Sequence, residues 1–360
     1  MAFKTRATEA LAIEHPIVQA PMAGGPTTPR LVAAVSNAGG LGSLGAAYLT
    51  PETLREQVRE IRDLTEAPFG VNLFVPSPFE VHLERIERAN TLLRQYRKEL
   101  EIEAPEKFSS FEESFEDQLG VVLEERVPVF SFTFGSVKSE LVGRLKENGA
   151  IVIGTATTVR EGLRLEEDGV DMVVAQGSEA GGHRGTFLGD IRDALIGTMA
   201  LVPQMVDTLS VPVLASGGIM DGRGLAAALV LGAEAAQMGT AFLASEESGA
   251  HSEFKRAVLE AAEDETAVTR AFSGRAARAI KNRFLVEVGE HEEELPPFPV
   301  QNALTKDVRA AAQRQDHAEF MSLWAGQAVR LSSPTNAAEL VESVVEGAEA
   351  ALRDLAPRPM

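Results

Sequence analysis

The chain contains no cysteine among its 360 residues. This absence excludes disulfides, thiolate-held iron–sulfur clusters and a thiol nucleophile, and it is typical of proteins from a reducing compartment. Histidine is also scarce, and His291 is followed by three glutamates without the second histidine that a zinc-binding helix needs. We therefore expect a cytoplasmic protein without a metal site.

Positive charge is in short supply as well. The chain has 34 Lys and Arg against 53 Asp and Glu, which gives a formal net charge of -19. Nucleic acids and anionic membrane surfaces carry the same sign over extended areas, so neither is an expected partner. A small anionic substrate remains compatible, because a local field can oppose the net charge. The segment from Met1 to Ile13 has no apolar core and predicts neither a signal peptide nor a membrane anchor.

Apolar runs that end in glycine or small polar residues alternate with amphipathic stretches over the first two-thirds of the chain. This alternation is typical of repeated βα units and a parallel sheet. The predicted strands are 17–20, 41–45, 69–74, 127–132, 150–154, 172–175, 211–216 and 235–239. Eight such units over roughly 240 residues match a TIM (β/α)8 barrel. A doubly wound open sheet would need a chain reversal that the sequence does not reveal.

The remaining segments follow other patterns. Residues 76–125 are highly charged and predict an elongated helical crossover with a solvated face, interrupted by a turn at Ser109-Ser110. Beyond Ala250 the strand rhythm disappears. We expect the barrel to span 1–250, a mostly helical cap to span 251–333, and 334–360 to form a C-terminal helix that packs back on the barrel.

A glycine-rich loop with a histidine follows the sixth predicted strand. Gln176, Gly181 and Gly182 precede His183, and glycine lets the backbone turn sharply and approach a ligand closely. Active sites of parallel barrels lie beyond the carboxyl ends of the strands, which is where this loop would lie. The loop is therefore a candidate active site, although a plain tight turn with His183 as a cap remains an alternative.

The loops after the seventh and eighth strands have the composition of a phosphate site. In TIM barrels these loops commonly bind phosphate through backbone N–H groups and a helix amino end. The alternative is a pair of tight barrel turns. The residues concerned are Ser216, Gly217, Gly218, Gln237, Met238, Gly239 and Thr240.

Small and amide residues complete the predicted barrel mouth. The segment after the first strand could lie along a planar ring, although a methionine alone is more often core packing. Asn72 and Gln176 carry amides that suit the heterocyclic edge of a flavin, with structural packing as the alternative. The segment after the first strand consists of Ala20, Pro21, Met22, Ala23 and Gly24.

Together these segments resemble the nitronate monooxygenases, formerly called 2-nitropropane dioxygenases, which are FMN-containing TIM barrels. The matching pieces are residues 20–24, 70–73, 177–185, 215–218, 237–243 and 246–248, and 133–135 adds a likeness to bacterial class I members. The resemblance implies that His183 is catalytic and that the barrel binds FMN. The FMN contacts it implies are Asn72, Gln176, Gly181, Gly218, Gln237, Met238, Gly239 and Thr240. From the loops described above we also expect Ala20, Pro21, Met22, Ala23, Gly24, Gly182, Ser216 and Gly217 at the cofactor.

The reaction that the resemblance implies is oxidative denitrification of a nitronate by FMN and O2, without reduced nicotinamide, to a carbonyl product and nitrite. Propionate 3-nitronate and alkyl nitronates are both candidate substrates. An NAD(P)H-using reductase of the enoyl-acyl-carrier-protein or quinone type on the same barrel is the main alternative, and a non-catalytic flavin-binding protein is another. The sequence is compatible with a homodimer but does not establish one. A barrel of the inosine-monophosphate dehydrogenase type is excluded, because it relies on a cysteine nucleophile.

Overall fold

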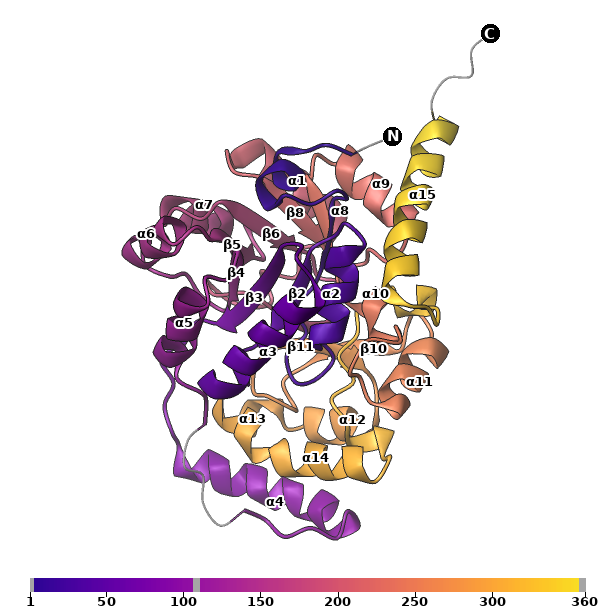
Figure 1. Cartoon of the computed structure of the whole chain (residues 1–360). Coiled ribbons are helices and arrows are strands. Elements are labelled where there is room, and N and C mark those ends of the chain that lie inside the picture. The colour runs from indigo at the N-terminus through magenta and orange to yellow at the C-terminus, as the bar shows by residue number, and fades with distance from the viewer. Residues whose placement is uncertain (1–2, 106–110, 356–360) are drawn as a thin grey trace.

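The computed structural model describes residues 3–105 and 111–355. Eight parallel strands follow one another around a barrel in the order β1-β9-β8-β6-β5-β4-β3-β2 (Figure 1). A parallel bridge between Val18 and Leu41 closes the barrel between β1 and β2. The strands are β1 (Ile17–Gln19), β2 (Gly42–Gly45), β3 (Phe69–Phe74), β4 (Val129–Thr133), β5 (Ile151–Ala156), β6 (Met172–Gln176), β8 (Val213–Ser216) and β9 (Ala235–Met238). The predicted TIM barrel is confirmed, with strand ends shifted by one or two residues.

The helices around the barrel begin at local capping signals. Thr28 and Thr50 each accept a hydrogen bond from the backbone N–H three residues later, and a proline occupies the first turn of each helix. No helix was predicted where α8 lies. The helices are α2 (Pro29–Asn37), α3 (Pro51–Leu64), α5 (Phe115–Glu124), α6 (Ser139–Glu147), α7 (Val159–Glu167), α8 (Thr198–Thr208), α9 (Gly222–Val230) and α10 (Thr240–Leu243).

The amino-terminal helix α1 (Arg6–Leu11) belongs to the barrel. Its buried residues Ala7 and Leu11 share a hydrophobic cluster with Val18, Val174 and Leu214 of the strands. Thr5 also donates a hydrogen bond to the carbonyl of Glu234, just before β9. The helix thus covers the amino ends of the strands and leaves the carboxyl ends as the open mouth.

The cap lies at the carboxyl ends of the strands and includes a helix that the sequence pattern assigned to the crossover. Helix α4 (Leu83–Glu99) packs against α13 and α14 (Figure 1). Tyr96 of α4 contacts the rings of Phe284 and Phe320, and the buried Arg97 pairs with Asp307 at 2.7 Å. Only the outer face of α4 is solvated. The other cap helices are α11 (Ser252–Glu260), α12 (Arg283–Gly289), α13 (Val300–Leu304) and α14 (Lys306–Arg314), with 3-10 turns η1 (Glu292–Glu294), η2 (Ala318–Phe320) and η3 (Val329–Leu331). The predicted turn at Ser109-Ser110 lies outside the described residues.

The cap also contains a small antiparallel sheet that the sequence pattern did not reveal. Strands β10 (Thr266–Thr269) and β11 (Ala277–Ile280) pair with each other, and β11 pairs with the two-residue strand β7 (Gly182–His183). These strands are too short to produce a clear alternation in the sequence, and β7 lies far along the chain from its partner β11. The sheet ties the histidine loop of the barrel to the cap.

The last helix, α15 (Ala337–Leu355), lies along α9 and α2 on the outside of the barrel (Figure 1). Glycines allow close contact: a Cβ on Gly222 would lie 2.2 Å from the backbone nitrogen of Ala348. Within residues 3–105 and 111–355, no helix is long and apolar enough to cross a membrane, and no group of three or more acidic or histidine side chains is arranged to hold a metal ion.

Candidate active site

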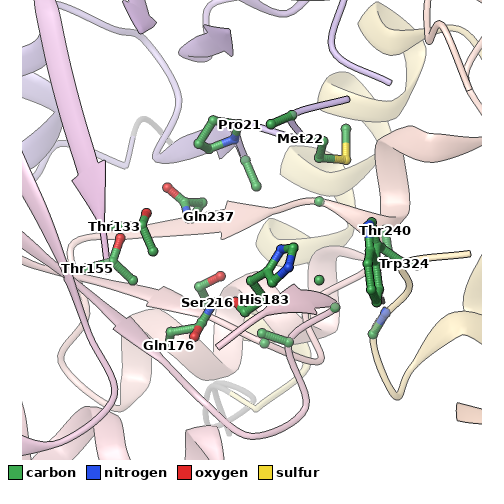
Figure 2. Close-up of a pocket in the computed structure, with 18 of the residues that line it drawn as sticks. Pro21, Met22, Thr133, Thr155, Gln176, His183, Ser216, Gln237, Thr240 and Trp324 are labelled. Carbon is green, nitrogen blue, oxygen red and sulfur yellow. Dashed lines mark hydrogen bonds between the residues drawn. The ribbon is translucent and has the colours of Figure 1, made fainter. Parts of the chain in front are cut away.

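A deep pocket lies between the mouth of the barrel and the cap. Its volume is about 1210 Å³, including the part open to solvent. In Figure 2, His183 lies in the middle, with Thr133 and Thr155 on one side and Thr240 and Trp324 on the other.

Most of the residues predicted for the site line this pocket. Two of them do not. Gly24 is exposed on the turn after β1, and Met238 is 1% exposed in the main hydrophobic core. The predicted residues that do line the pocket are Ala20, Pro21, Met22, Ala23, Asn72, Gln176, Gly181, Gly182, His183, Ser216, Gly217, Gly218, Gln237, Gly239 and Thr240.

The loop after β8 presents backbone donors to the pocket. Gly217 and Gly218 have φ values of +121° and +72°, which a side chain would strain. Within the described part of the chain, neither of their N–H groups donates to a protein acceptor. Gly217 is half-buried and Gly218 is exposed, so their free N–H groups are accessible from the pocket and can donate to an anionic oxygen of a ligand.

The loop after β9 lies beside it. A Cβ on Gly239 would make only ordinary contacts, 3.4 Å from Ala20 Cβ and 3.8 Å from Met22 Sδ. The hydroxyl oxygen of Thr240 accepts a hydrogen bond from the backbone N–H of Gly326 at 2.8 Å, which leaves its own hydrogen free to donate. Gly239 is therefore not required by the protein's own packing.

The three amides of the pocket have different roles. Gln176 donates to the carbonyl of His183 at 3.0 Å and accepts from the N–H of Gly185 at 2.8 Å, so it holds the histidine segment in place. Asn72 donates to the Ser131 hydroxyl at 2.9 Å. Gln237 lines the pocket, and its side chain has no hydrogen-bond partner among the described residues. Its amide is the one most clearly available to a ligand.

His183 is held on strand β7 by backbone pairing with Ala277 of the cap. Its Nε2 lies 2.8 Å from the Ser273 hydroxyl, which also donates to the carbonyl of Arg275 at 3.1 Å. Aromatic rings surround the imidazole. The rings are Phe74, Phe134, Phe298 and Trp324, with centroids 5.1 to 6.2 Å from that of His183.

The electrostatic surroundings of His183 are positive. Burial, and then the charges of Arg275 and Arg309, lower its pKa to about 3, so the imidazole is neutral at pH 7. Arg275 lies over the Phe134 ring with Cζ 3.8 Å from the centroid. Phe134 itself has φ +80°, a strained conformation for a bulky residue. This strain places its ring between Arg275 and His183.

Several of these residues were missed by the sequence analysis. Tyr48 lines the pocket, and its buried hydroxyl has no hydrogen-bond partner in the described part of the chain; burial raises its pKa to about 12. Its position shortly after β2 was a usable signal. Ser273, Arg275 and Trp324 carried no such signal in the sequence. They come from cap segments, and the sequence pattern does not reveal where those segments lie in the fold.

Known proteins resemble this chain over its full length. The family model described as nitronate monooxygenase matches residues 4–347. Proteins named probable nitronate monooxygenase are 48% identical in Staphylococcus haemolyticus, over 96% of this chain and 97% of the relative, and 46% identical in Staphylococcus aureus, over 95% and 96%. Among solved structures, a nitroalkane oxidase from Streptomyces ansochromogenes has a TM-score of 0.92 at 40% identity and covers 98% of this chain and 100% of that one. FabK from Thermotoga maritima has a TM-score of 0.77 at 33% identity, with 98% of both chains covered.

Proposed function

Because the chain belongs to the nitronate monooxygenase family, we propose that it oxidises nitronates with FMN and O2 to a carbonyl product and nitrite, without reduced nicotinamide. Family membership makes the protein an oxidoreductase and indicates a flavin and a small-molecule substrate. The observation that carries the proposal is the neutral His183 beside two cationic side chains, in a pocket that also has a loop of free backbone donors.

The pocket fits FMN. The unpartnered N–H groups of Gly217 and Gly218, with the Thr240 hydroxyl, suit a phosphate. The free amide of Gln237 suits the heterocyclic edge of the ring system. When bound, FMN supplies the electron acceptor that an electron-rich carbanion can reduce and that O2 can reoxidise. The chain itself then has to bind, orient and desolvate the substrate.

The charges around His183 favour a substrate that is already an anion. An imidazole whose pKa is about 3 is a weak base for removing the α-proton of a neutral nitroalkane. A nitronate needs no proton removed, and the positive charges of Arg275 and Arg309 attract it. The free hydroxyl of Tyr48 can donate to it as well. Propionate 3-nitronate and alkyl nitronates both fit this description.

We further propose that the barrel and the cap have different functions. The barrel, residues 1–250 without α4, binds the cofactor. The cap, residues 251–333 with α4, supplies the substrate-facing side chains, and 334–360 serves the barrel through α15. Contacts between β7 and β11 join the two at His183.

Oxygen uptake by the purified protein tests the proposal. We expect the released flavin to be FMN, and we expect O2 consumption and nitrite formation with propionate 3-nitronate or ethyl nitronate in the absence of NADH. Release of FAD alone, or no flavin binding after reconstitution with FMN, would exclude the cofactor. NADH oxidation with no response to nitronates would instead indicate the NAD(P)H-using reductase. Flavin binding without either activity would indicate a non-catalytic flavin protein.

A further inference from the structure

The peptide bond between Gly217 and Gly218 lies at the edge of the pocket and is held from behind by a threonine. Thr198, the first residue of α8, donates a hydrogen bond from its hydroxyl to the carbonyl oxygen of Gly217 at 3.0 Å. The contact is close: a Cβ on Gly217 would lie 2.8 Å from the same hydroxyl oxygen. Thr198 is 9% exposed.

The direction of one peptide group determines what the pocket presents. In a trans peptide the C=O and the following N–H point in opposite directions. When the Gly217 carbonyl points to Thr198, the Gly218 N–H therefore points away from it. Glycines with positive φ flank this peptide bond on both sides, so side chains do little to prevent it from flipping. A flipped peptide would turn a carbonyl oxygen toward a phosphate and repel it.

We propose that Thr198 is a positioning residue that holds the Gly217–Gly218 peptide with its N–H toward the cofactor phosphate. This inference rests on the proposed FMN site. Thr198 acts through the Gly217–Gly218 peptide instead of on the phosphate itself, and this role makes the start of α8 part of the cofactor site.

Glu179 fixes the orientation of Thr198 in turn. Both carboxylate oxygens of Glu179 accept from the Thr198 backbone N–H at 2.9 Å, and one also accepts from its hydroxyl at 2.8 Å, so the single hydroxyl hydrogen is shared between Glu179 and the Gly217 carbonyl. The N-cap residue Gly197 has no side chain, so Glu179 satisfies the amino end of α8. With a carboxylate already in that position, a phosphate is directed to the glycine loop instead of the helix end.

The test compares two ligands that differ only in the phosphate. FMN and riboflavin are titrated onto the deflavinated full-length protein, and the two dissociation constants are compared for wild type, Thr198→Val and Thr198→Ser. Valine keeps the shape of threonine but lacks the hydroxyl, and serine restores it. Thr208→Val is the matched control, because Thr208 lies at the other end of α8 and its hydroxyl, among the residues that the structure describes, bonds only the carbonyl of Gln204.

We expect Thr198→Val to weaken FMN binding by about tenfold and riboflavin binding by less than about twofold, as the loss of one buried hydrogen bond predicts. Thr198→Ser and Thr208→Val should match wild type. Equal losses for both ligands, or no loss for either, would overturn the positioning role. A wild-type protein that binds FMN no more tightly than riboflavin would overturn the phosphate site itself, and this outcome is visible before any variant is made.

Discussion

The barrel side and the cap side of the pocket, called here the barrel wall and the cap wall, present different chemical groups. The barrel wall, formed by 20–23, 216–218, 237 and 239–240, presents glycines, hydroxyls, amides and free backbone N–H groups. The cap wall consists of Trp324, which lines the pocket, and of Ser273, Arg275, Phe298 and Arg309, which surround His183 without lining the pocket; it presents aromatic rings and cations to the imidazole. Every element of the barrel wall lies at the carboxyl end of a strand, whereas the cap wall comes from loops and one helix beyond residue 270.

This difference indicates how the site divides its tasks. Backbone donors and glycines recognise a phosphate and a flat ring with little dependence on side-chain identity. Charged and aromatic side chains instead set the polarity around a small substrate and the protonation state of a nearby histidine. Changes on the barrel wall should therefore act on cofactor binding, and changes on the cap wall should act on turnover.

The largest expected effect is that of His183→Asn. Because the His183 imidazole, with a pKa of about 3, is a weak base, we expect the loss with neutral nitroalkanes to lie near the lower end of the roughly 10²–10⁴-fold range that removal of a general base costs. Oxidation of preformed nitronate should fall less, because no proton has to be removed. Steady-state oxygen uptake with both substrates, alongside flavin content and thermal unfolding, measures the effect. Wild-type rates on both substrates would show that His183 is not catalytic. Loss of flavin from the variant would show that His183 serves cofactor binding instead of turnover.

A substitution on the barrel wall should weaken cofactor binding instead of slowing turnover. Gly239→Val should weaken FMN binding by about tenfold or more while the barrel stays folded, because the pocket has room for a Cβ until a cofactor is present. Titration of FMN onto the apoprotein measures it. Gly143→Val is the control, since Gly143 on α6 also has open space around its Cβ position. Gly218→Val is less informative, because its φ of +72° strains any side chain. Unchanged FMN affinity in Gly239→Val would mean that this glycine serves only the turn.

A smaller effect is expected at the hydrogen bond behind His183. Ser273→Ala removes the partner of Nε2, and a single hydrogen bond of this kind is worth about 0.5–1.5 kcal/mol, or roughly two- to tenfold in rate. We expect kcat/KM for nitronates to fall by roughly two- to tenfold, and we expect the affinity for FMN to stay unchanged. Ser343→Ala on the exposed face of α15 is the control. A parallel fall in FMN affinity would contradict the separation of the two walls.

The last expected effect is on stability in acid and not on binding or turnover. His183 has a pKa of about 3 in the folded protein and about 6.5 when unfolded, so the unfolded chain binds more protons between these values. The contribution of His183 is neutral above pH 6.5, and it destabilises the fold as pH falls toward 3. His183→Asn should therefore lose less stability than wild type between pH 7.5 and pH 4.5 in denaturant titrations. Equal losses would show that the pKa of His183 is close to its ordinary value.

The sequence alone was sufficient for the barrel wall. A parallel strand buried on both faces is a local apolar run, and the residue where it ends is visible in the pattern, so the loops carrying Gly217, Gly239 and His183 could be placed at one rim. Gly24 and Met238 were the exceptions, because a motif does not specify which of its neighbouring residues faces inward.

Only the tertiary structure decided the cap wall and the chemistry of His183. Strands β10 and β11 are recognisable through their pairing with each other and through the pairing of β11 with β7. Helix α4 joins the cap because Tyr96 and Arg97 contact residues 284 and 307. The proton affinity of His183 follows from burial and from Arg275 and Arg309, which lie 92 and 126 residues further along the chain. Glycine and strand patterns act over a few residues and can be recognised in the sequence. Burial and charge act through space, and the sequence does not specify them until the chain has folded.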